Sequence, residues 1–199
     1  AQDKLLVAGS GNPNILLLDK QTGKVEWQHA LEKGEECNAV ALTRKGEILY
    51  SYKRGAKLVT WDHQVVWDYK TPDKTELQSA TLLQNGGVLL GICGIPAQFI
   101  ELDKKGKEVN KVTLNLEVER PHSQFRQIFQ LRNSNYLIPV MAKQKVLEVS
   151  RKGKIIAEHQ IEGKAFSSLE LPNGNLLLPC GDNHYYIVID RKTGKELKR

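Results

Sequence analysis

The chain has 199 residues, with 29 lysines and arginines against 23 aspartates and glutamates and a net charge of +6. Its 40% hydrophobic and 26% charged residues are typical of a globular protein. No apolar run approaches the ~18 residues that a membrane-spanning helix needs. The totals therefore exclude an integral membrane protein built from helices, and they allow one large domain or two small ones.

The start of the chain and its cysteines bear on the cellular compartment. The chain begins with Ala1 and Gln2 rather than with methionine, and small residues precede signal-peptide cleavage sites. We therefore expect an exported protein, either periplasmic or extracellular. Cys37, Cys93 and Cys180 are odd in number and widely spaced, so we expect separate buried thiols rather than a disulfide framework or a zinc site.

Two kinds of strand-turn-strand segment alternate along the chain. In chain order they span residues 15–30, 39–52, 57–69, 80–93, 98–112, 127–140, 145–160, 168–180 and 185–198. The segments are rich in Val, Ile, Leu, Tyr and Phe, and their turns carry Gly, Asn and Asp. Paired segments have turns 16 or 17 residues apart, as from Gly46 to Asp62. Four short strands repeating about every 40 residues are typical of a β-propeller blade.

The predicted fold is therefore all-β: a β-propeller of four-stranded antiparallel blades, with about five blades in a single domain spanning residues 1–199. The first unit lacks its innermost strand, and the last unit ends near its outermost strand. Propellers commonly close when one terminus completes the blade begun by the other. We expect five blades of a six-bladed ring that is incomplete at the C-terminus. A five-bladed ring with an imperfect first blade is the alternative.

One hairpin carries a recognisable motif. Residues 16–28, LLLDKQTGKVEWQ, resemble the D-x-x-T-G-K-x-x-W hairpin of the PQQ-like, or quinoprotein-dehydrogenase-like, β-propellers, and residues 188–197 repeat it without the tryptophan. The chain is also similar to small secreted single-propeller proteins of Bacteroidetes type. Quinone-binding members carry adjacent cysteines and dedicated cofactor and calcium ligands. This sequence has neither, so we expect no PQQ and no other cofactor.

The two faces of the predicted disc differ in character. The tight turns carry 13 of the 29 basic residues, spread around the rim as solubilising charges. Without aromatic residues between them, they do not form a nucleic-acid track, and we expect no nucleic-acid partner. The opposite face holds the loops that cross from one blade to the next, which we call the crossing face.

Polar side chains recur on the crossing face where the chain enters each innermost strand. Equal offsets from successive turns predict equivalent positions around the axis. The connection that holds residues 119–127, ERPHSQFRQ, is also seven residues longer than two of the other crossings and four longer than the third, and one enlarged loop on a rigid scaffold is a common way to build a site. The candidate ligand-binding residues are Glu36, Asn38, Glu76, Gln78, His122, Gln124, Arg126 and Gln127, with no catalytic or metal-binding residue assigned.

Each candidate also has a structural interpretation. Arg126 can bind a carboxylate through two parallel hydrogen bonds, and the structural alternative is an ion pair with Glu36 or Glu76 across blades. His122 can be a base, a ligand contact or a loop-stabilising group. His184 beside Tyr185 is interpreted as an ordinary loop pair. His29, His63 and His159 are predicted to lie on the surface.

Three functions remain open at this point. The sequence favours a non-enzymatic exported propeller that binds a small polar or carbohydrate-like ligand, or a partner, at the channel mouth. The alternatives are a metal-assisted lyase acting on a uronate-like or lactone-like substrate and a pure protein-interaction scaffold. The lyase is weakened because only His122 and His184 are available as imidazole ligands on the crossing face.

Overall fold

The computed structural model describes residues 3–9 and 11–199, and they form five antiparallel sheets. Ala1 and Gln2, on which the export prediction depends, lie outside the described residues. Blade 1 contains β1 (Lys4–Val7), β2 (Asn14–Asp19) and β3 (Val25–Ala30). Blade 2 contains β4 (Cys37–Leu42), β5 (Ile48–Tyr52), β6 (Gly55–Val59) and β7 (Val65–Lys70). Blade 3 contains β8 (Glu76–Leu82), β9 (Val88–Cys93), β10 (Ala97–Leu102) and β11 (Glu108–Leu114).

The last two blades have very short innermost strands. One short 3-10 helix precedes blade 4, and one connects the second and third strands in each of the two blades. Blade 4 contains β12 (Phe129–Gln130), β13 (Tyr136–Val140), β14 (Lys145–Val149) and β15 (Ile155–Gln160). Blade 5 contains β16 (Leu169–Glu170), β17 (Leu176–Cys180), β18 (Tyr185–Ile189) and β19 (Glu196–Lys198). The 3-10 helices are η1 (Pro121–Ser123), η2 (Met141–Lys143) and η3 (Gly181–Asn183). In the described ranges, no helix has the length and apolarity to cross a membrane.

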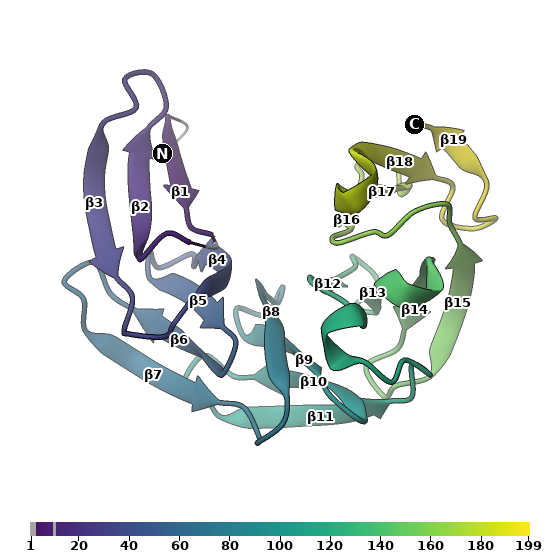
Figure 1. The fold of residues 1–199 in the computed structure, drawn as a ribbon, viewed down its shortest axis with the longest axis horizontal. Helices are drawn as coiled ribbons and strands as arrows, with labels where there is room; N and C mark the ends of the chain where they lie inside the picture. The colour runs from purple at the N-terminus through teal and green to yellow at the C-terminus, as the bar shows by residue number, and fades with distance from the viewer. Residues whose placement is uncertain (1–2, 10) are drawn as a thin grey trace.

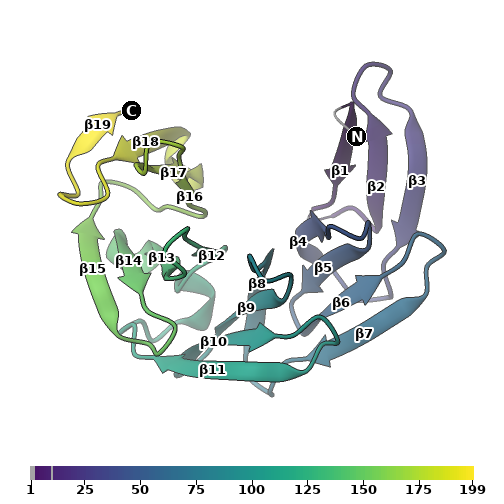
Figure 2. The ribbon, with the colours of Figure 1, turned by 180° about the vertical axis from the view of Figure 1, so that it is seen from behind.

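The blades follow one another around a common centre, which confirms the predicted propeller. Within each sheet, consecutive strands pair in chain order. Figures 1 and 2 show β4, β8, β12 and β16 at the centre, with β3, β7, β11, β15 and β19 at the circumference. Among the residues described, blade 1 has three strands and no innermost one, as predicted. The six-bladed ring and the incomplete C-terminus stay predictions.

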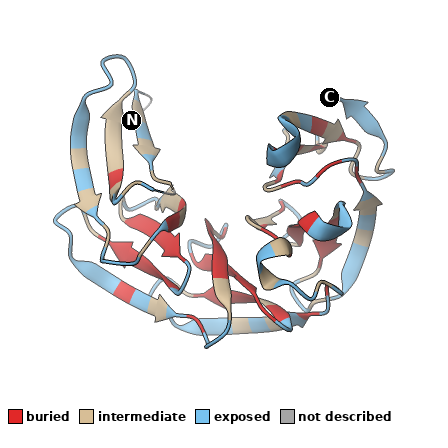
Figure 3. Ribbon diagram, in the orientation of Figure 1, coloured by how far each residue is buried: buried red, intermediate tan, exposed pale blue. Residues whose placement is uncertain are grey.

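The core lies between neighbouring blades rather than inside any one of them. The middle strands β5, β6, β9 and β13 are buried along their whole length, because both faces of these sheets pack on other blades. The outer strands β7 and β15 are largely exposed, and Figure 3 shows this change from buried centre to exposed rim. This packing explains why the middle strands are mainly apolar.

The three cysteines are free and buried, as predicted. Burial raises the pKa of the Cys37 thiol to about 11 and that of Cys93 to about 12. Both side chains are therefore neutral at physiological pH and have little nucleophilic character.

Candidate functional site

A hollow opens on the crossing face where three connecting segments meet. These are the β5–β6 turn, the crossing from β7 to β8, and the loop that leads into η1. The cavity has a volume of about 450 Å³. Its lining residues are Lys53, Arg54, Lys74, Thr75, Glu76, Arg120, Pro121 and His122. We call it the crossing-face pocket.

Glu76 is the centre of the pocket's hydrogen-bond network. One carboxylate oxygen lies 3.0 Å from His122 Nδ1, and the other lies 3.1 Å from Lys53 Nζ. The Gln78 amide donates to Glu76 over 3.1 Å. Burial opposes ionisation of Glu76, but His122 and Lys53 outweigh it and lower the pKa of this carboxyl. The structure thus brings together three of the predicted residues, Glu76, Gln78 and His122.

Arg126 holds the enlarged loop rather than pairing with an acid. Its guanidinium donates to the backbone carbonyls of His122 and Phe125, over 2.6 Å and 3.3 Å. It also lies over the Phe166 ring, 5.8 Å from the centroid. The interpretation of Arg126 as the ion-pair partner of Glu76 is wrong, because Glu76 pairs with Lys53 and His122 instead.

Gln124 is a buried structural tie. Its carbonyl oxygen accepts from the Gly94 N–H over 3.0 Å, and its amide donates to the carbonyls of Gly94 and Val118 over 2.7 Å and 3.1 Å. The side chain fixes the enlarged loop to blade 3. Because these contacts use both ends of the amide, the role of Gln124 is to support the loop.

Asn38 and Gln78 occupy equivalent positions, as equal spacing predicted. Each is the extra residue of a β-bulge in an innermost strand, β4 or β8. A bulge redirects the side chain of its extra residue. The Asn38 amide donates to the Leu77 carbonyl of the next blade over 2.9 Å, whereas Gln78 turns to Glu76. The same kind of β-bulge therefore gives Asn38 a structural contact with the next blade and gives Gln78 a contact within the pocket network.

The remaining predicted residues lie outside the crossing-face pocket. Gln127 accepts from the Ser167 hydroxyl over 3.1 Å. Together with Asn38 it lines a separate cavity of about 380 Å³ beside β4. Glu36 is exposed and lines neither of these two cavities.

The sequence analysis missed an aromatic cluster between blades 1 and 2. His29 Nδ1 and His63 Nδ1 are 3.1 Å apart, and both rings stack on Trp27 with centroids 5.9 Å and 5.4 Å away. The Trp27 N–H donates to the Trp61 carbonyl over 2.8 Å. Burial and the neighbouring His63 lower the pKa of His29. The signal was available, because His29 and His63 lie on the outermost hairpins of adjacent blades.

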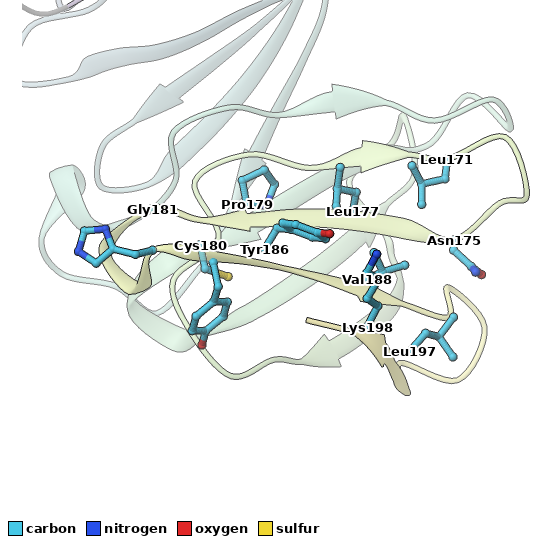
Figure 4. A pocket seen from close by; sticks show the side chains of 12 residues that line it. Leu171, Asn175, Leu177, Pro179, Cys180, Gly181, Tyr186, Val188, Leu197 and Lys198 are labelled. Carbon is cyan, nitrogen blue, oxygen red and sulfur yellow. The ribbon is translucent and has the colours of Figure 1, made fainter.

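A third hollow lies on the face of blade 5 that points away from blade 4 (Figure 4). Leu177, Tyr186 and Val188 line it, and they alternate with residues that pack against blade 4. In blade 4 the equivalent face, with Leu137 and Val146, is covered by blade 5. This hollow therefore has the character of a blade-packing surface.

No metal site emerges from the described part of the chain: no three His, Cys, Asp or Glu side chains are grouped to hold an ion.

Comparison with solved structures gives a strong match to a protein of unknown function from Bacteroides caccae. The match has 39% identity and a TM-score of 0.93, and it covers 98% of this chain and 72% of the other.

More distant structures share the fold alone. A streptogramin B lyase is 13% identical with a TM-score of 0.77, covering all of this chain and 65% of the other. The WD40 propeller domain of Doa1 is 11% identical with a TM-score of 0.76, covering 99% of this chain and 64% of the other. No curated protein matches the chain.

The expected PQQ-like affiliation is not confirmed by these comparisons. A different family model, described as Mal s 1 allergenic protein-like, matches residues 12–198. This match spans nearly the whole propeller, from the end of the β1–β2 connection to the last strand. The chain belongs to the Mal s 1 allergenic protein-like family.

Proposed function

We propose that this propeller is a binding module whose crossing-face pocket takes a small polar ligand with a carboxylate, such as a uronate. The observation that carries the proposal is an excess of unpaired positive charge around a preorganised network. Lys74 and Arg120 line the pocket and form no ion pair with any described residue. Glu76 is the pocket's lining acid. An anion would therefore meet two free cations at the pocket's edge.

The rest of the pocket supports recognition of hydroxyl groups. The His122 Nδ1 atom is used by Glu76, which leaves the Nε2 atom for a ligand. The Thr75 hydroxyl donates to the Pro72 carbonyl over 2.7 Å, and its oxygen can still accept a hydrogen bond. Arg54 is tied to Asp73 and to the carbonyls of Pro72 and Thr75, so it shapes the wall. Fixed polar groups of this kind bind with little loss of conformational entropy.

The test is isothermal titration calorimetry with D-glucuronate, using D-glucose as the uncharged control. We expect glucuronate to bind more tightly, and Arg120→Gln to weaken its binding about 5-fold to 10-fold, as for the loss of one charge-assisted contact. Lys105→Gln, an exposed cation on the opposite face, is the matched control and should leave binding unchanged. Equal binding of both sugars, or no effect of Arg120→Gln, would contradict the proposal.

A lyase is the second candidate, because Glu76 and His122 form a carboxylate–imidazole pair 3.0 Å apart. Such a pair can orient a base that removes the proton at C5 of a uronate, while the group at C4 leaves and a C4=C5 double bond forms. The fold shared with a streptogramin B lyase permits this reaction and does not argue for it. Ultraviolet absorbance of the unsaturated product during incubation with polygalacturonate tests the reaction.

Export and the likeness to secreted PQQ-like propellers stay predictions. A protein-interaction scaffold is the third candidate, and it predicts capture of one partner together with no stabilisation by any sugar acid. If the protein is a binding module, glucuronate should raise its melting temperature without any partner protein.

A further inference from the structure

Two blade junctions share an ionic clamp near the tight turns. Between blades 3 and 4, Arg151 donates through Nε to both oxygens of the buried Glu101, over 2.8 Å and 3.0 Å. Between blades 4 and 5, Arg191 donates to Glu148 over 2.8 Å and 2.9 Å. In each case an acid on the third strand of one blade meets an arginine in the following blade's last turn.

The junction between blades 2 and 3 lacks this clamp. The strand registers make Leu58 equivalent to Glu101, because each is one residue before the strand's end and faces the corresponding residue of its neighbours. Lys104 follows Asp103 as Arg151 follows Ser150. Leu58 and Lys104 thus replace the acid and the arginine, and both line a cavity of about 370 Å³. We call it the turn-face cavity. Its volume is within the range of small-molecule sites.

At this junction the buried Trp67 indole N–H has no hydrogen-bond acceptor among the described residues. Its equivalent in blade 1, Trp27, donates its indole N–H to the Trp61 carbonyl over 2.8 Å. The Trp67 N–H is buried and finds no partner among the residues that the structure describes. A buried donor without an acceptor is costly in a folded protein. The Trp67 ring lines the turn-face cavity together with Leu58, Leu82 and Leu83.

The lining of the turn-face cavity carries more cations than acids. Arg44, Lys45 and Lys104 line it, and none of the three forms an ion pair with a described residue. The two acids in the lining are engaged in turns. Glu47 accepts from the Thr43 hydroxyl over 3.2 Å, and Asp103 accepts from the N–H groups of Lys105 and Lys107 over 2.8 Å and 2.9 Å.

We propose that the turn-face cavity binds a small aromatic carboxylate, with its ring against Trp67 and Leu58 and its carboxylate between Arg44, Lys45 and Lys104. An aromatic ring fits beside an indole and aliphatic side chains better than a hydroxylated sugar does. The carboxylate supplies the negative charge that Glu101 and Glu148 supply at the other junctions. This site lies on the opposite face from the crossing-face pocket and is independent of it.

The test is calorimetric titration with 3-phenylpropanoate, with 3-phenylpropanamide as the uncharged control. We expect saturable binding of the acid, with the amide and the Lys104→Ala variant each weaker by about 5-fold to 10-fold. Lys152→Ala, an exposed turn lysine in blade 4, is the matched control and should bind like wild type.

The double variant Leu58→Glu/Lys104→Arg builds the chain's own clamp into the cavity and should abolish binding. Far-ultraviolet circular dichroism and thermal unfolding confirm that each variant is folded, and Lys104→Ala keeps the test decisive if the double variant unfolds. Absence of binding by folded wild type at 10 mM acid would overturn the proposal. Equal binding by the clamped variant or by Lys104→Ala would overturn it as well.

Discussion

Replacing Glu148 by glutamine should weaken the junction between blades 4 and 5 at neutral pH and much less in acid. The buried carboxylate accepts from Arg191 over 2.8 Å and 2.9 Å, and from Asn133 and Asn135 over 2.9 Å and 2.6 Å. Burial opposes its ionisation, but these donors outweigh burial and lower the pKa from 4.5 to about 2. Because one pKa unit corresponds to about 1.4 kcal/mol, the ionised form stabilises the fold by roughly 3 kcal/mol.

The sign of the pH dependence follows from the lowered pKa. This stabilisation is complete well above pH 4.5, where the unfolded carboxyl is also ionised, and it is lost as the pH falls through about 2. At pH 3 about 1 kcal/mol should remain. Glu148→Gln should therefore lose roughly 3 kcal/mol in the free energy of unfolding at pH 7 and about 1 kcal/mol at pH 3.

Urea unfolding followed by circular dichroism at the two pH values measures this difference. Glu158→Gln is the matched control, because Glu158 is an exposed acid that contacts Lys145 over 3.0 Å. Its loss should stay below about 1 kcal/mol. A Glu148→Gln variant as stable as wild type at pH 7, or one whose deficit is equally large at pH 3, would refute the reasoning.

Three further predictions concern packing and titration. A Cβ at Gly106 would lie 2.6 Å from Trp67 Cγ at a φ of +80°, so Gly106→Ala should cost about 2 to 4 kcal/mol in urea unfolding. Gly174→Ala has a similar φ with nothing within 4 Å, and it should cost only about 1 kcal/mol. The Cys93 thiol should react with a thiol reagent at least 100-fold more slowly in the native state than in urea; similar rates would contradict its burial. In an NMR titration, His29 should change charge below pH 6.5, because burial and His63 lower its pKa.

The fold was predictable because repetition is visible without coordinates. Turns at Gly46, Gly86, Ser134 and Gly174 lie 16 or 17 residues before the turns that follow them, and units of this kind repeating about every 40 residues are typical of propeller blades. All four residues have positive φ in the structure. The same periodicity predicted that Asn38 and Gln78 are equivalent, and both are bulge residues.

The partners of the candidate residues were less predictable. Spacing fixes where a backbone position lies around the axis, whereas a side chain's partner depends on loop conformation. Arg126 therefore donates to backbone carbonyls of its own loop. The Gln124 side chain hydrogen-bonds to the Gly94 backbone of blade 3. Lys53, which forms an ion pair with Glu76, lies in the β5–β6 turn and was not among the predicted residues.

The blade junctions follow a second pattern that the repeat makes visible in the sequence. The third-strand position reads Leu17, Leu58, Glu101 and Glu148 in successive blades, and the outer-strand residue opposite it reads Trp27, Trp67, Asn110 and Ala157. Leucine is thus paired with tryptophan, whereas glutamate is paired with a smaller residue and meets an arginine from the next blade. At the junction between blades 2 and 3, Lys104 occupies the position of the arginine, but Leu58 occupies the position of the acid. This cation without its acid supports a carboxylate ligand at this junction rather than at the others.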